Sequence, residues 1–166
     1  MPTDDRPDEV PDELCQELRL ALVINGGVSL AVWMGGVVAE LDRFRCALHR
    51  QAPPVGDDPY GDLLRALRTD VVVDVVAGTS AGGINGALIA FAAGNGIPLD
   101  AVGQDAVRDT WQVLGDIDGL LYRSDDPPSV LRGEEVLFAG TSRVLHRLAE
   151  AAADPDLRLA PSATRR

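Results

Sequence analysis

The 166-residue chain contains no lysine, and all fifteen of its basic residues are arginine. Against 26 acidic residues, these arginines leave a formal net charge of −11 at pH 7. This balance argues against a broad electrostatic attraction to nucleic acid or to anionic lipid. We therefore expect no nucleic-acid partner, and any contact with lipid has to be local and apolar.

Cysteine and histidine are also scarce. The two cysteines, Cys15 and Cys46, lie far apart and in no metal-ligand spacing, which favours two reduced thiols in a cytoplasmic protein. We accordingly expect neither a metal nor another cofactor. The two histidines, His49 and His146, lie within predicted helices, where we expect both to be solvated.

No long hydrophobic run is present. The longest strongly apolar stretches, residues 20–24 and 87–93, are far below the ~18–20 residues that a membrane-spanning helix needs. The first seventeen residues hold seven acids and three prolines, which predicts a disordered acidic leader rather than a secretory signal. These features favour a cytoplasmic protein, soluble or peripheral at a membrane.

The chain does contain a strand, helix, strand pattern. A nearly continuous apolar run at residues 18–25 is typical of a parallel strand covered on both faces. A second, β-branched run follows at residues 71–77, and the connection between them is long enough for a right-handed parallel crossover. The sequence therefore predicts an α/β fold. Two strands alone rarely make a stable sheet, so we expect an incomplete domain.

Helical spacing dominates the rest of the chain. From Ser29 to about Arg50, apolar residues recur every three or four positions, and Gly35 and Gly36 within this helix predict close packing against another backbone. Its polar face holds Glu40, Asp42, Arg43, Arg45 and Arg50. The further predicted elements are a short turn at 63–67, helices at 81–93, 98–115 and 133–152, and an irregular segment at 116–129.

The turn after the second strand carries the clearest motif. Gly78-Thr79-Ser80-Ala81-Gly82 matches the G-x-S-x-G nucleophile elbow of serine hydrolases. Glycine is required at Gly78 and Gly82 because a Cβ there would collide with the neighbouring strand or helix. The motif predicts that Ser80 stands at the tip of a sharp strand-to-helix turn, with its hydroxyl exposed.

A serine nucleophile also needs oxyanion donors and a base. The loop Asn25-Gly26-Gly27-Val28 leaves the carboxyl end of the first strand, so its amides are expected beside the elbow. The base is harder to assign. His49 and His146 are expected to be solvated, Asp74 to be a strand-face residue, and Asp118-Gly119 is a weak candidate in an Asp-Gly turn.

Residues 20–41, with their Asn-Gly-Gly loop, and residues 74–87, with Gly-Thr-Ser-Ala-Gly-Gly, together resemble the first third of a patatin-like phospholipase domain. The resemblance implies a patatin-like three-layer fold with a mainly parallel sheet, incomplete in this chain. It also implies hydrolysis of lipid acyl esters by a Ser-Asp dyad without metal. Ser80 would be the nucleophile, and Gly26, Gly27 and Val28 would supply oxyanion-hole amides. The implied organisation is a leader at 1–17, the N-terminal portion of a patatin-like domain at 18–153, and a tail or truncation point at 154–166.

The sequence departs from the family pattern in two places. The family loop usually has glycine, a basic residue and glycine where this chain has Asn25, Ser29 and Leu30, which resembles a divergent bacterial patatin-related branch. The family's Asp-Gly-Gly or Asp-Gly-Ala turn is absent, and Asp118-Gly119-Leu120 comes too early. We therefore expect the catalytic aspartate to lie beyond Arg166.

Two other functions remain open. A glycine-rich loop after a strand also binds phosphates, but residues 25–30 do not match G-x-G-x-x-G and residues 78–83 lack the Lys-Ser/Thr of a P-loop. A noncatalytic regulatory or interaction domain on the same scaffold is the second alternative, because the basic loop residue and the acid are both missing.

Overall fold

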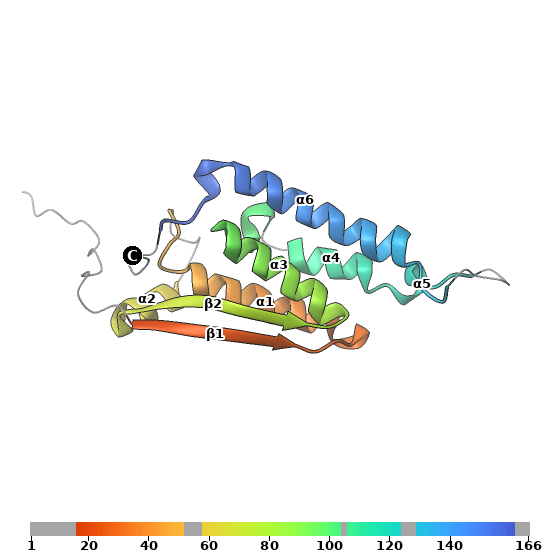
Figure 1. The fold of residues 1–166 in the computed structure, drawn as a ribbon, viewed down its shortest axis with the longest axis horizontal. Helices are drawn as coiled ribbons and strands as arrows, with labels where there is room; N and C mark the ends of the chain where they lie inside the picture. Colours follow the sequence, from red (N-terminus) through yellow and green to blue (C-terminus); the bar gives the residue numbers. More distant parts are fainter. Residues whose placement is uncertain (1–15, 52–57, 104–105, 124–128, 162–166) are drawn as a thin grey trace, which may run out of the picture.

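The computed structural model describes residues 16–51, 58–103, 106–123 and 129–161. Its strands and α-helices are β1 (Gln16–Ile24), α1 (Ala31–Cys46), α2 (Pro59–Leu67), β2 (Thr69–Gly78), α3 (Ala81–Asn95), α4 (Ala106–Leu114), α5 (Ile117–Leu120) and α6 (Ala139–Ala153) (Figure 1). Short 3-10 turns occupy η1 (Val28–Leu30), η2 (Leu99–Val102) and η4 (Pro155–Leu157), and η3 (Gly133–Phe138) is a π-helical segment that leads into α6.

The two strands form a parallel pair, which confirms the predicted α/β class. Pairing runs from Gln16 opposite Thr69 to Ile24 opposite Gly78, so the carboxyl ends of both strands meet at one edge. The register shifts once, where Asp74 is the extra residue of β2. This alignment brings the loop after β1 directly beside the turn after β2.

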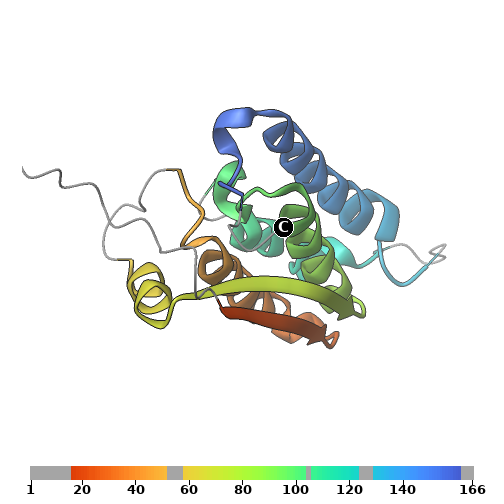
Figure 2. The ribbon, with the colours of Figure 1, turned by 60° about the vertical axis from the view of Figure 1, so that its left-hand side comes forward.

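The helices lie on one face of this sheet (Figures 1 and 2). Leu22 and Ile24 of β1 pack into the core on that side, whereas Val23 is 77% and Val75 56% exposed on the other side. The expectation that the first strand is covered on both faces is therefore wrong for the described residues. The apolar run does place side chains on both faces, but the helices described here cover only one.

Helix α3 lies at the centre of the core. It contains no charged residue, and it contacts β2, α1 and α6, which lie around it (Figure 1). Its Leu88 and Ile89 are fully buried, together with Ile97, Leu114 and Leu148 from the surrounding elements. A helix without charged residues is suited to this position, because much of its surface packs against the sheet and the neighbouring helices. The helix that carries the elbow is thus held in the core, although Ala87 and Ala90 remain exposed.

A buried ionic cluster joins the end of α1 to the segment after α3. Asp42 is 1% exposed, its carboxylate accepts a hydrogen bond from the Leu99 amide at 2.7 Å, and it pairs with Arg45. Arg45, 7% exposed, also donates to the carbonyl oxygen of Ile97 at 2.6 Å. Burial raises the pKa of Asp42. Asp42 and Arg45, which the sequence places on the polar face of this helix, are thus buried, because they pair with each other and with backbone groups more than fifty positions away.

Several predicted boundaries also change. The helix expected at 98–115 is broken, because Gly103 has a φ of +119° between η2 and α4. A Cβ on Gly35 would lie 2.9 Å from Trp111, which confirms close packing there, but a Cβ on Gly36 would meet nothing within 4 Å. Part of the predicted tail is attached to the domain: the Leu159 amide donates to the Gly96 carbonyl at 2.7 Å.

The remaining boundaries agree more closely. Helix α2 fills the place of the predicted short turn, and Asp58 caps it by accepting a hydrogen bond from the Gly61 amide at 3.0 Å. Helix α3 ends at Gly96, which adopts the left-handed conformation with φ +63°, within the predicted Gly-Asn-Gly terminus. Most of the predicted acidic leader and Cys15 lie outside the described residues, although Gln16 already belongs to β1.

Candidate active site

Ser80 occupies the tip of the turn between β2 and α3. Its φ of 52° and ψ of −125° are rare for a residue with a side chain, and the residue is exposed. Two backbone hydrogen bonds hold the turn: the Gly82 amide donates to the Thr79 carbonyl at 2.9 Å, and the Ile84 amide to the Ser80 carbonyl at 3.1 Å. Strained backbone of this kind persists only where the surroundings impose it, and it concentrates at functional sites.

The two flanking glycines make the sharp turn feasible. A Cβ on Gly78 would lie 2.6 Å from the carbonyl carbon of Gly82, and a Cβ on Gly82 would lie 2.7 Å from the carbonyl carbon of Ile24. Both obstacles are backbone atoms, which cannot rotate away as a side chain can. The glycine at each end of the motif is therefore a packing requirement, and α3 crosses the end of β1 in direct contact.

The glycine loop after β1 rests against this elbow. A Cβ on Gly26 would lie 2.8 Å from the Cβ of Ser80, and Gly27 has a φ of +143° that favours glycine. The Thr79 amide donates to the Ile24 carbonyl at 3.2 Å, and the Gly26 amide donates to Thr79 Oγ1 at 3.2 Å. The structure thus brings together Gly26, Gly27 and Ser80, as the parallel pairing predicted.

Two backbone amides near Ser80 have no hydrogen-bond partner in the described part of the chain. The Gly26 amide is engaged by Thr79, whereas the amides of Gly27 and Ala81 make no hydrogen bond to the described part of the chain. Ala81 is the first residue of α3, whose N-terminus carries partial positive charge. Unpaired N–H groups are therefore available in the glycine loop and directly after Ser80, as an oxyanion site requires.

No carboxylate or imidazole contacts Ser80 among the described residues. Asp74 is paired with Arg19 at 3.0 Å on the exposed face of the sheet, in line with its predicted strand-face role. Asp118 lies in the short helix α5, exposed, where Arg123 binds its carboxylate at 2.8 Å. Both acids are occupied by arginine partners rather than directed at the nucleophile.

The histidines are likewise engaged elsewhere. His146 is 77% exposed and lies 3.4 Å from Glu150, which confirms the predicted solvated helix residue. His49 is different: it is 17% exposed, and its Nε2 lies 2.7 Å from the carboxylate of the buried Asp70. The expectation of a solvated His49 is wrong. Asp70 is eight residues before Gly78 on β2, roughly 26 Å from the elbow at ~3.3 Å per residue.

A buried asparagine links the elbow helix to its neighbours. Asn85 is fully buried, accepts a hydrogen bond from the Trp111 indole at 2.7 Å and donates to the Ala31 carbonyl at 3.4 Å. It thereby joins α3 to the first turn of α1, directly after the glycine loop. The sequence carried a signal for this role, a lone amide within an otherwise apolar helix, which indicates a buried polar contact.

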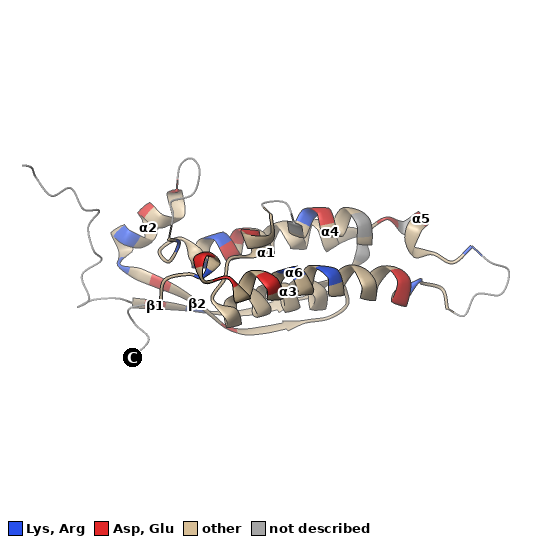
Figure 3. Ribbon diagram, turned by 90° about the horizontal axis from the view of Figure 1, so that it is seen from above, with Lys and Arg blue, Asp and Glu red and all other residues tan. Residues whose placement is uncertain are grey.

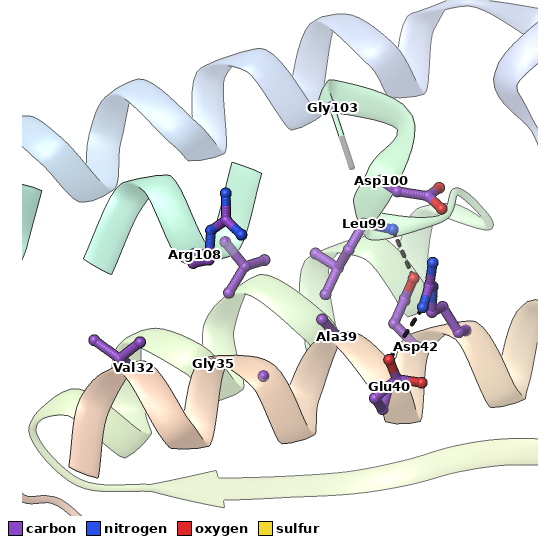
Figure 4. Close-up of a pocket in the computed structure, with 12 residues that line it drawn as sticks. Val32, Gly35, Ala39, Glu40, Asp42, Leu99, Asp100, Gly103 and Arg108 are labelled. Carbon is purple, nitrogen blue, oxygen red and sulfur yellow. Dashed lines mark hydrogen bonds and ion pairs between the residues drawn. The ribbon is translucent and has the colours of Figure 1, made fainter. Parts of the chain in front are cut away.

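Neither of the two cavities described here contains Ser80. The first, about 310 Å³, lies between α1 and the η2–α4 segment, with Val32 and Ala39 facing Leu99 and Arg108 (Figure 4). The second, about 430 Å³, lies along β2 from Asp70 to Val76, beside Arg45. Ser80 lines neither cavity and is exposed.

The described part of the chain offers neither a metal site nor a membrane-spanning helix. The described residues contain no group of three or more histidine, cysteine or carboxylate side chains placed to hold a metal ion. Likewise, none of the described helices is both long and apolar enough to cross a membrane. Cys46 is fully buried, and burial raises the pKa of its thiol.

Comparison with known proteins gives two matches in sequence. The patatin-like phospholipase family model matches residues 22–148, which include the glycine loop, the elbow and most of α6. The uncharacterized membrane protein Rv3479 of Mycobacterium tuberculosis is 36% identical over 152 residues, covering 82% of this chain and 14% of that protein. The chain thus spans only a small part of this relative's length. No solved structure shows a significant match to the chain.

Proposed function

Because the chain belongs to the patatin-like phospholipase family, we propose that it carries the nucleophile and oxyanion loop of a lipid acyl hydrolase. The observation that carries this proposal is the backbone of Ser80, whose positive φ presents an exposed hydroxyl beside free amides. The substrate class is an acyl ester of a lipid. In this proposal the protein is cytoplasmic and meets its substrate at the periphery of a membrane.

In the proposed reaction, Ser80 Oγ attacks the ester carbonyl carbon as its proton passes to a base. The tetrahedral intermediate then collapses: the bond to the leaving oxygen breaks, the base returns its proton to that oxygen, the alcohol departs, and an acyl group remains on Ser80. Water, deprotonated by the same base, hydrolyses this acyl-enzyme and releases the fatty acid. Splitting the reaction in this way replaces one difficult displacement by two easier ones, without metal or organic cofactor.

We assign the oxyanion donors to the glycine loop and the start of α3. Of the amides expected from the sequence, Gly27 and Val28 keep this role, while Gly26 donates to Thr79 Oγ1 and holds the loop against the elbow. Ala81 joins them, because its amide is free and lies at the positive end of α3. Removing one such donor typically costs about 100-fold or more in kcat.

The base in this proposal is the aspartate expected beyond Arg166. The support is that each candidate within them has another partner: Asp74 pairs with Arg19, Asp118 with Arg123 and His49 with Asp70. The 166-residue chain is therefore expected to hydrolyse esters slowly or not at all, even though its nucleophile is correctly mounted.

A noncatalytic domain on the same scaffold is favoured by one observation: none of the described residues places a base beside Ser80. The hydrolase and the noncatalytic domain differ in whether a longer protein that contains the chain turns over an ester. If the proposal holds, the longest reading frame that includes the chain hydrolyses a p-nitrophenyl ester, and Ser80→Ala abolishes turnover.

The matched control is Ser129→Ala, which alters an exposed serine hydroxyl in the segment before η3. This variant keeps the wild-type rate. Turnover that survives Ser80→Ala, or complete inactivity of a folded longer protein that contains an Asp-Gly-Gly or Asp-Gly-Ala turn, contradicts the proposal.

A further inference from the structure

Helix α1 exposes apolar residues where a surface helix normally carries polar ones. Leu30, Trp33 and Val37 lie at i, i+3 and i+7 and are 53%, 67% and 38% exposed. On the opposite side of the helix, Ala31, Met34 and Val38 are buried in the core. We call Leu30, Trp33 and Val37 the α1 stripe. The first half of α1 is thus apolar on both its buried and its exposed side.

Charge is excluded from this region although the chain as a whole is strongly acidic. Residues 28–39 contain no charged side chain, and the first turn of α1 holds no acid. In contrast, charged residues of both signs lie along α2, α4 and α6 (Figure 3). Exposed apolar residues scattered singly are ordinary, but a row of three with a tryptophan is a typical interaction surface.

The stripe is continuous with the proposed catalytic site. A Cβ on Gly27 would lie 4.0 Å from Leu30 Cβ, and a Cβ on Gly26 would lie 2.8 Å from Ser80 Cβ. Leu30 therefore adjoins the glycine loop, and the loop in turn lies against Ser80. A surface that covers the α1 stripe therefore also lies close to Ser80.

We propose that the α1 stripe docks on the surface of a zwitterionic lipid layer and thereby places Ser80 at the lipid–water boundary. This inference rests on the proposed function, since it names how that site meets its substrate. The net charge of −11 disfavours an anionic layer, whereas an uncharged apolar stripe inserts without an electrostatic penalty. Tryptophan suits the lipid–water boundary, because its ring is apolar and its N–H reaches water.

The two tryptophans allow a direct test on the 166-residue chain. Trp33 is 67% exposed, whereas Trp111 is 3% exposed and hydrogen-bonded to Asn85. The Ser80→Ala chain, which cannot turn over lipid, is mixed with phosphatidylcholine vesicles whose acyl chains carry bromine. Bromine quenches a tryptophan that enters the apolar layer, so wild-type fluorescence falls, while Trp33→Phe retains binding and loses the quenching.

Co-sedimentation with the same vesicles measures how far each side chain contributes. Leu30→Ser and Trp33→Ser each weaken partitioning by about tenfold, the effect of withdrawing one large apolar side chain from lipid. The matched control is Leu67→Ser on α2, at the opposite end of the sheet, where the leucine is 58% exposed. This control changes partitioning by less than about twofold.

The outcomes separate this proposal from the function of Ser80. Absence of vesicle binding, unquenched Trp33, or an equal loss with Leu67→Ser overturns the lipid surface. A dimer in solution that Trp33→Ser dissociates also overturns it, because a second copy then covers the stripe. If the longer protein binds vesicles but its Ser80 is inert, the proposed hydrolase function is contradicted instead. If Ser80 is reactive but the protein does not bind vesicles, only the proposed lipid contact of the α1 stripe is contradicted.

Discussion

Replacing Gly82 by alanine tests the packing that shapes the elbow. The added Cβ would lie 2.7 Å from the carbonyl carbon of Ile24 and 2.8 Å from the carbonyl oxygen of Asn25. Ordinary contacts begin near 3.4 Å, so the end of β1 has to move away from α3 by at least ~0.7 Å. Overpacking of this kind costs typically ~1–3 kcal/mol and occasionally more, against ~1 kcal/mol gained from helix propensity.

Because the obstacles are backbone atoms, we expect a cost at the upper end of this range, ~3 kcal/mol. The net loss in the free energy of unfolding is then about 2 kcal/mol, or roughly 4–8 °C in Tm. Urea unfolding followed by circular dichroism measures it. Gly94→Ala is the matched control, because Gly94 lies in the same helix and a Cβ there meets nothing within 4 Å. That variant gains up to ~1 kcal/mol. If Gly82→Ala is as stable as Gly94→Ala, the described contact between α3 and the end of β1 is wrong.

Three further predictions concern buried polar groups. Asn85→Leu leaves a buried indole N–H without its acceptor and lowers the free energy of unfolding by ~1–3 kcal/mol, measured by urea titration; an unchanged midpoint refutes the link between α3 and its neighbours. Arg45→Met leaves Asp42 without its cation and costs ~3–5 kcal/mol at pH 7. Burial raises the pKa of Asp42, so its contribution to folding stability is fully present below the pKa of the unfolded chain and is lost as pH rises through the pKa of the folded protein. The difference in stability between wild type and Arg45→Met therefore narrows on acidification. A difference in Tm that does not change with pH contradicts this. In a Cys15→Ser chain, the buried Cys46 resists a thiol reagent such as DTNB at pH 8 until urea unfolds the protein, and rapid native labelling refutes its burial.

Local patterns were sufficient to predict the region around the serine. The β-branched run of β2, the small-residue turn and the apolar helix after it define the elbow, and parallel pairing of two strands places the glycine loop beside it. These features depend on residues close together in sequence and on rules that hold for any parallel sheet. The family match and the α/β class follow from the same residues.

Long-range partners could not be predicted. Asp42 and Arg45 fit a polar helix face by spacing, yet they are buried because the Leu99 amide and Ile97 carbonyl need partners there. His49 pairs with Asp70 for a similar reason, since the end of α1 meets the start of β2. At Gly103, apolar spacing continues across a break that only the backbone conformation reveals.

We expect Ser80 to be an activated nucleophile, and covalent labelling measures this reactivity directly. The longest reading frame containing this chain is treated with a fluorophosphonate probe, and peptide mass mapping locates the modified residue. We expect a single adduct on the peptide that holds Ser80, lost in Ser80→Ala and retained in the control Ser129→Ala. A folded protein that takes up no probe, or takes it up at another serine, refutes an activated Ser80.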